Sequence, residues 1–147
     1  MKICWVIGQD SNSKFTKGTR IEARNTMERI VQEEGVRLFC AFGTNDFEAG
    51  CCDMANVLRE GKTKGNILLG ILGVPSLMQN DLSREIWGKW AYCCKPQHIP
   101  PRVWIRATKK MAEHADCVLL GTQNANDLVS AAEYARSLGK PVYKVFA

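Results

Sequence analysis

The residues best suited to ligand chemistry are concentrated in three polar segments, each of which follows an apolar run. The first spans residues 8–18 and leads into a helical pattern that carries several basic side chains. Backbone N–H groups and the dipole at a helix start attract anions, and a strand-to-helix loop longer than roughly six residues is commonly functional. We therefore expect a phosphate or nucleotide contact here, with a solvated surface loop as the alternative. The candidate ligand-binding residues are Gly8, Gln9, Asp10, Ser11, Lys14 and Arg20.

The second segment, residues 43–50, also separates an apolar run from a helical pattern. Its glycines permit close backbone approach, and its short polar side chains can either cap the helix or hydrogen-bond a sugar. We expect capping to account for one of them. The candidates are Gly43, Thr44, Asn45 and Asp46.

The third segment, residues 121–127, is rich in side-chain amides. An amide both donates and accepts hydrogen bonds, which suits a base edge or a hydroxyl. Capping of the last helix by Asn126 or Asp127 is the alternative. Three such segments at one edge of a sheet favour binding over three separate caps. The candidates are Gly121, Thr122, Gln123 and Asn124.

Carboxylates in the same segments decide whether the protein could also be an enzyme. Cleavage of an N-glycosidic bond needs a group that stabilises or attacks the anomeric carbon, and a carboxylate is the usual choice. If the protein is an enzyme, its candidate catalytic residues are Asp127 and Glu48. Ser130, near the predicted start of the last helix, cannot replace a carboxylate nucleophile without a base. Binding or sensing is therefore favoured over hydrolysis or transfer.

The seven cysteines are expected to be reduced, since their number is odd and the chain is long enough to bury a hydrophobic core without the help of disulfide bonds. Three of them lie in apolar runs and should be buried as small hydrophobic residues. These are Cys4, Cys40 and Cys117. The adjacent pairs Cys51-Cys52 and Cys93-Cys94 do not match zinc spacings, so we expect no metal site and no cofactor. Cys51 and Cys52 are predicted in the first turn of a helix, where the dipole can lower the pKa of a thiol.

Composition favours one soluble globular domain. The chain has 147 residues, of which 46% are hydrophobic and 24% charged, which argues against a disordered, fibrous or membrane protein. The longest apolar stretch, Ile67–Val74, is far shorter than the roughly 20 residues that a bilayer span needs. No signal-peptide pattern follows Met1, so we expect a cytoplasmic protein. The net charge of +5 favours anionic partners, although the basic residues are spread along the chain.

Strand and helix patterns alternate along the sequence. Strands are predicted at Lys2–Ile7, Val36–Phe42, Asn66–Leu72, Asp116–Leu120 and Pro141–Phe146. Helices are predicted from a capping box at Thr19–Glu22 to a stop at Gly35, at Ala49–Glu60, at about Asp81–Cys94, from Pro101 to His114, and at Leu128–Leu138. This order predicts an α/β fold: a Rossmann-like three-layer sandwich around a five-stranded, mostly parallel sheet. Ligands of such sheets lie beyond the carboxyl ends of the strands, near the point where strand order reverses.

The final third of the chain resembles a known family. Ala115-Asp116 opens an apolar strand, Gly121-Thr122 ends it, and Asp127, Ala135 and Gly139-Lys140-Pro141-Val142 follow. This stretch is similar to the C-terminal half of the SLOG superfamily, which includes YspA-like, DprA-like and LOG-like domains, and it shares features with nucleoside 2-deoxyribosyltransferases. The resemblance implies a single SLOG-like domain over residues 1–147, with a helical insertion at about residues 79–100. The resemblance implies a class of ligand, nucleotide-derived molecules, but it does not imply a particular reaction. The Pro-Gly-Gly-x-Gly-Thr-x-x-Glu motif of LOG enzymes is absent.

Three functions follow as hypotheses. The preferred one is a domain that binds a phosphorylated nucleoside or an ADP-ribose-like molecule as a sensor or sequestering module, as a homodimer or higher homo-oligomer. The second is an enzyme that cleaves the N-glycosidic bond of a nucleoside or nucleotide, as a hydrolase or deoxyribosyltransferase. The third is DprA-like nucleic-acid binding, which the net charge and the predicted fold support. No membrane association is expected.

Overall fold

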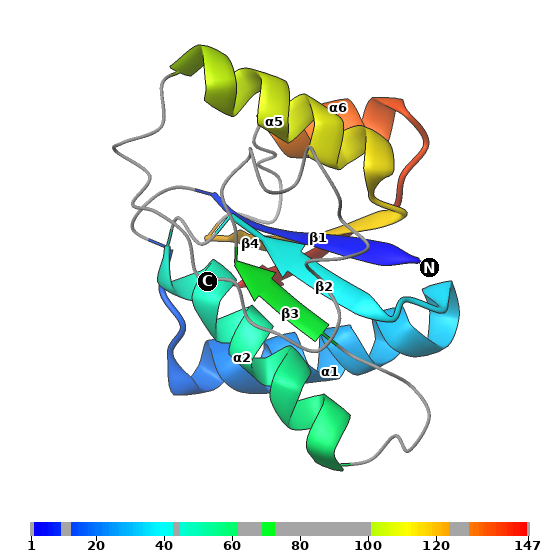
Figure 1. The fold of residues 1–147 in the computed structure, drawn as a ribbon. Helices are drawn as coiled ribbons and strands as arrows, with labels where there is room; N and C mark the ends of the chain where they lie inside the picture. Colours follow the sequence, from blue (N-terminus) through cyan, green and yellow to red (C-terminus); the bar gives the residue numbers. More distant parts are fainter. Residues whose placement is uncertain are drawn as a thin grey trace.

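The computed structural model describes residues 2–9, 13–42, 45–61, 69–72, 101–123 and 130–146. Within these ranges, strands and helices alternate along the chain (Figure 1). The elements are β1 (Ile3–Gly8), α1 (Lys17–Glu34), β2 (Leu38–Ala41), α2 (Asp46–Gly61), β3 (Leu69–Leu72), α5 (Pro101–His114), β4 (Cys117–Thr122), α6 (Ser130–Ser137) and β5 (Val142–Phe146). The helix predicted at Asp81–Cys94 and the insertion predicted at residues 79–100 lie outside the described residues.

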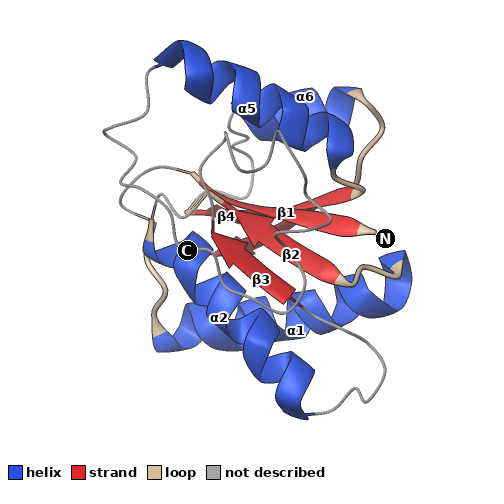
Figure 2. Ribbon diagram, viewed as in Figure 1, coloured by secondary structure: helices blue, strands red, loops and turns tan. Residues whose placement is uncertain are grey.

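The strands form one parallel sheet with the order β3-β2-β1-β4-β5 (Figure 2). From β1 the chain adds strands on one side through β2 and β3, and then on the other side through β4 and β5. The order therefore reverses between β1 and β4, at the centre of the sheet. Helices α5 and α6 cover one face, and α1 and α2 cover the other (Figure 1). The predicted α/β class and the parallel sheet are confirmed.

Each face of the sheet has its own apolar core, because successive side chains of a strand point to opposite sides. On β1, Cys4 and Val6 are buried with α1 and α2, whereas Trp5 and Ile7 are buried with α5 and α6. The same alternation on β4 places Gly121 on the α1–α2 side and Thr122 on the α5–α6 side. The two faces of the sheet thus present different groups at its carboxyl edge.

Helix α1 begins earlier than the sequence pattern predicted. Its N-cap is Thr16, whose side-chain oxygen accepts the Thr19 N–H at 3.2 Å. Thr19 therefore lies inside the first turn instead of capping the helix. The predicted end is confirmed, because Gly35 adopts a left-handed conformation with φ 68° and its N–H bonds to the Val31 carbonyl.

None of the helices in the described ranges combines the length and the hydropathy that a bilayer span requires.

Candidate functional site

The first turn of α2 is organised by two polar side chains three positions apart. The Glu48 N–H donates to Asn45 Oδ1 at 2.9 Å, and Asn45 Nδ2 donates to Glu48 Oε2 at 2.8 Å. Asn45 is thus the N-cap of α2, which confirms that capping accounts for one residue of this segment. It also moves the helix start to Asp46, ahead of the predicted Ala49. The Asn-x-x-Glu spacing is a capping signal in the sequence, and it would have revealed the part that Glu48 takes.

Glu48 also joins α2 to the end of β1. Its Oε2 atom accepts the Gly8 N–H at 3.1 Å, and only 2% of the residue is exposed. The same oxygen therefore receives two donors, one from Gly8 and one from Asn45. These bonds fix the last residue of a central strand against the start of a helix.

Two glycines allow α2 to approach the strand ends closely. Gly8 and Gly121 are paired neighbours at the ends of β1 and β4. A Cβ at Gly8 would overlap the Asn45 side chain, and a Cβ at Gly121 would lie 2.6 Å from ring atoms of Phe47. The α1–α2 side of the strand reversal is therefore filled by the first turn of α2.

The segment before α1 is held against the same turn. The Phe47 N–H donates to the Ser13 carbonyl at 3.3 Å. Phe15 meets Phe47 edge-on, with ring centroids 6.4 Å apart, and a Cβ at Gly50 would overlap the Phe15 ring. Sequence reasoning missed Ser13, Phe15 and Phe47, although two aromatic residues inside polar segments are a usable signal for an anchored loop.

Gln9 links the two central loops on the opposite side of the reversal. Its N–H donates to the Gly121 carbonyl at 2.9 Å and so extends the β1–β4 pairing by one bond. Its side-chain Oε1 accepts the Thr122 hydroxyl at 3.0 Å and the Gln123 N–H at 3.2 Å. We call this set of residues, Gln9, Thr122 and Gln123, the Gln9 link. It brings together predicted residues of the first and third polar segments.

Three of the predicted charged residues, Lys14, Asp46 and Arg20, are exposed to solvent. Lys14 and Asp46 form an ion pair at 3.8 Å, with 64% and 72% of their side chains exposed. Arg20 is exposed on α1, and its side chain has no hydrogen bond or ion pair within the described residues. Six predicted site residues lie outside the described ranges. They are Asp10, Ser11, Gly43, Thr44, Asn124 and Asp127.

The prediction that the helix dipole lowers the pKa of a thiol is wrong for Cys51. This residue is fully buried in the second turn of α2, and burial, followed by the negative charge of Glu48, raises its pKa well above the ordinary value. Cys4 and Cys40 also have raised pKa values, mainly because of burial. The cysteines in the described ranges form no disulfide and are buried, as predicted for Cys4, Cys40 and Cys117. The same ranges hold no cluster of potential metal ligands.

These thiols should resist alkylation in the folded protein. After iodoacetamide treatment at pH 8, peptide mass mapping is expected to find Cys4, Cys40 and Cys51 unmodified, and to find them modified when urea is present. Modification of Cys51 in the folded protein at the rate seen in urea would contradict this.

The same thiols make stability depend on pH. Above about pH 8.5 the unfolded chain loses thiol protons that the folded chain keeps, so the free energy of unfolding falls as the pH rises. Urea titrations between pH 7 and about 9.5 measure this decline. Cys40→Ala should make the decline of the free energy of unfolding with pH shallower. The same decline in this variant as in the unchanged protein would contradict its assignment to the buried thiols.

The described part of the carboxyl edge thus offers neutral hydrogen-bonding groups on the α5–α6 side, at the strand reversal where open α/β sheets bind ligands. The Gln9 amide, held in position by the buried Thr122 hydroxyl and by the Gln123 N–H, suits a base edge or a ribose hydroxyl. Comparison with models of known protein families gives no match and comparison with curated proteins gives none, so the interpretation of the site depends on its own geometry.

Proposed function

We propose that the protein binds a nucleotide-derived small molecule, such as a phosphorylated nucleoside or an ADP-ribose-like ligand, as a sensor or sequestering module. The observation that carries the proposal is the Gln9 link, which joins the loops after β1 and β4 at the reversal of strand order. We further propose that the fold is a five-stranded Rossmann-like sandwich of the SLOG type. Both proposals keep the ligand at the carboxyl edge of the sheet.

The side chain of Gln9 has a defined orientation in this proposal. Because Oε1 receives two donors, the amide cannot flip without losing both hydrogen bonds. Its Nε2 group has no acceptor within the described residues and remains available to a ligand oxygen or ring nitrogen. The ligand is expected on the α5–α6 side, because the first turn of α2 fills the other side.

The position of Glu48 argues against the catalytic role predicted for this residue. A nucleophile or general acid must come within hydrogen-bonding or bonding distance of the substrate. Glu48 is 2% exposed, and one of its oxygens already receives the Gly8 and Asn45 donors. Asp46, the other carboxylate in the first turn of α2, differs from Glu48 because it is exposed to solvent, where it forms an ion pair with Lys14. We infer that Glu48 positions the end of β1.

A panel of nucleosides, nucleotides and ADP-ribose tests the proposal when melting temperature and product formation are followed together. A ligand at about 100 times its Kd should stabilise the folded protein by about 2.7 kcal/mol. A rise in melting temperature without product supports binding. Product formation would instead support an N-glycoside-cleaving enzyme. If no compound of the panel raised the melting temperature, the proposal would be contradicted.

Gln9→Met is expected to weaken binding of the identified ligand by about tenfold, or about 1.4 kcal/mol, because methionine keeps the volume but loses the amide. Isothermal titration calorimetry measures the change. Gln32→Met, an exposed position on α1, is the matched control and should bind as the unchanged protein does. Equal affinity of both variants would place the ligand elsewhere.

A further inference from the structure

The Gln9 side chain can offer a ligand hydrogen-bond donors but no acceptor. A backbone N–H can only donate, and that of Gln123 lies 3.2 Å from Gln9 Oε1, so the oxygen of the amide must face Gln123. The Thr122 hydroxyl donates to the same oxygen at 3.0 Å. An amide oxygen has two lone pairs, and both are therefore used within the chain. The Nε2 amino group is what remains for a ligand.

A fixed amide discriminates between ligand groups. Gln9 is partly buried after β1, where the strand order reverses, and Nε2 has no acceptor within the described residues. A ligand acceptor that reaches Nε2 forms a hydrogen bond with it. A ligand donor would instead face a donor, and the amide could turn to accept it only by breaking both bonds to Oε1.

The chemistry around Gln9 suits the base of a nucleotide better than its phosphate or ribose. The residues of the Gln9 link carry no charge, whereas phosphates are commonly bound by cations and helix starts. A ribose hydroxyl both donates and accepts, so it can satisfy either orientation of an amide and does not need a fixed one. The edge of a base has a fixed polarity, which a fixed amide can distinguish.

Nucleobases fall into two classes by the polarity of one exocyclic group. Guanine and hypoxanthine carry the acceptor O6 beside the acceptor N7, and uracil carries the acceptor O4. Adenine and cytosine carry an amino donor at the corresponding position. A glutamine with a free oxygen reads adenine by accepting from N6 and donating to N7. In Gln9 that oxygen already receives two donors, so this pairing is not open to it.

We propose that Gln9 makes the carboxyl-edge site selective for a keto base, which is hypoxanthine or guanine among the purines and uracil among the pyrimidines. This inference rests on the proposed function, because it assigns the base of the bound nucleotide to the Gln9 side of that site. The Nε2 group donates to the keto oxygen. An adenine in the same position would bring its N6 donors against the donors of Gln9, so adenine-containing ligands are the disfavoured members of the proposed class.

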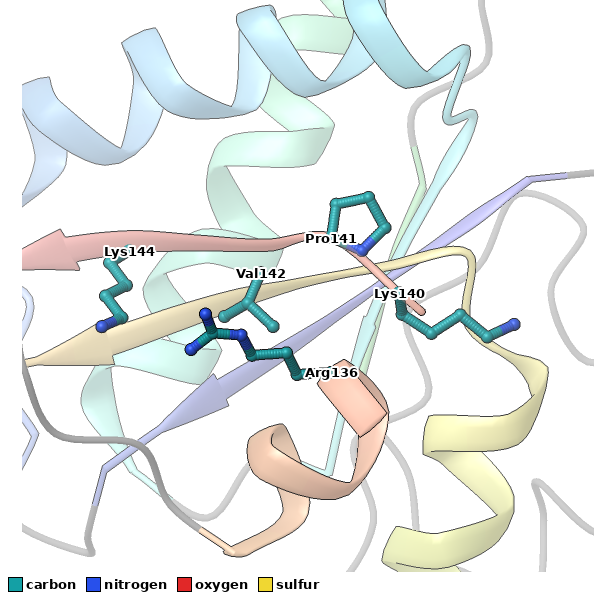
Figure 3. Close-up of a pocket in the computed structure, with 5 residues that line it drawn as sticks. All are labelled: Arg136, Lys140, Pro141, Val142 and Lys144. Atoms are coloured by element: carbon teal, nitrogen blue, oxygen red, sulfur yellow. The ribbon is translucent and has the colours of Figure 1, made fainter. Parts of the chain in front are cut away.

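A cavity of about 300 Å³ beside β5 is another place where a small molecule could bind (Figure 3). Val142, which lines it, pairs with Val118 of β4, whereas the Gln9 N–H bonds to the Gly121 carbonyl. These two points are three residues apart on β4, or about 10 Å along the strand. Substitutions at Gln9 should therefore leave binding in this cavity unchanged, and their effect on a nucleotide reports on the carboxyl edge.

Calorimetric titration of the full chain with inosine monophosphate and adenosine monophosphate tests the proposal. The two ligands share the ribose and the phosphate, and their purines differ at C6 and the adjacent N1. Inosine monophosphate is expected to bind about tenfold more tightly. Uridine and cytidine monophosphates repeat the comparison for the pyrimidines, with the uridine compound expected to bind more tightly.

Gln9→Glu should shift this preference towards adenine. One carboxylate oxygen keeps the bonds from Thr122 and Gln123, and the other replaces the free amino group and can accept from adenine N6. The ratio of the inosine to the adenosine monophosphate affinity should fall by about tenfold or more. The ratio cancels the repulsion between the new charge and the phosphate, because both ligands carry that phosphate. Gln32→Glu adds the same charge at an exposed position on α1 and should leave the ratio unchanged.

Gln9→Met removes the donors without adding a charge and should bring the ratio close to one, so the test does not depend on the folding of a single variant. Equal affinities in the unchanged protein, tighter binding of adenosine monophosphate, or a ratio that neither Gln9 variant changes would overturn the proposal. Nucleotide binding in any of these cases would leave the proposed function intact. If no nucleotide binds at all, the proposed function fails, and the selectivity of Gln9 fails with it.

Discussion

Replacing Glu48 with alanine is expected to lower the free energy of unfolding by about 3–4 kcal/mol. The substitution leaves the buried Gly8 N–H and the Asn45 amide without the oxygen that accepts both of them. It also leaves space where a residue that is 2% exposed had packed. Urea denaturation followed by circular dichroism measures the loss.

Glu48→Gln separates the hydrogen bonds from the charge. Glutamine can present an oxygen to both donors, so we expect a loss of only about 1 kcal/mol. Glu133→Ala, at an exposed position on α6, is the control and should change stability by less than about 0.5 kcal/mol. Wild-type stability of Glu48→Ala would show that these bonds contribute little. If that variant also lost a measured turnover, Glu48 would be catalytic.

Gly121→Ala is expected to destabilise the protein by about 2–3 kcal/mol through overpacking. The added Cβ would lie 2.6 Å from two ring atoms of Phe47. Phe47 is fully buried and is held by Phe15 and by the α2 backbone, so its ring has little room to move. The same urea titration reports the effect.

Gly18→Ala is the control for this change, because the nearest heavy atom to its Cβ would be Thr16 Oγ1, at 4.0 Å. Alanine in the first turn of α1 should stabilise the protein by about 0.5–1 kcal/mol. Combining Gly121→Ala with Phe47→Leu should recover part of the lost stability, as expected for two residues in contact. A Gly121→Ala protein as stable as the unchanged one would refute the close packing of α2 on β4.

The sequence predicted the elements well where local chemistry alone decides them. Gly35 and Gly139 end helices because their positive φ values favour glycine. The start of α1 was misassigned because Thr16 and Thr19 are both good caps. The choice between them depends on Phe15, which precedes Thr16 and packs on Phe47 and Gly50 from another part of the chain. The sequence shows two aromatic residues in polar segments, but it does not show that they meet each other.

The site was predictable only in outline. Strand ends in a parallel sheet share one edge, so the sequence could indicate which loops meet there. The partners of Gln9 follow from the register of Gly8 with Gly121, which a local pattern does not contain. Cys51 shows the limit of reasoning about pKa from sequence, because burial outweighs the dipole of the helix that carries it.

Strand β5 has a consequence for self-association. It lies at one end of the described sheet order, so its outer backbone groups could template the addition of a further strand and start aggregation. Pro141 stands just before the strand and Lys144 lies within it, and both residue types discourage such edge-to-edge growth. Two copies aligned through this edge would also bring their lysines together. Any homo-oligomer of this chain is therefore expected to leave the β5 edge of the sheet exposed to solvent.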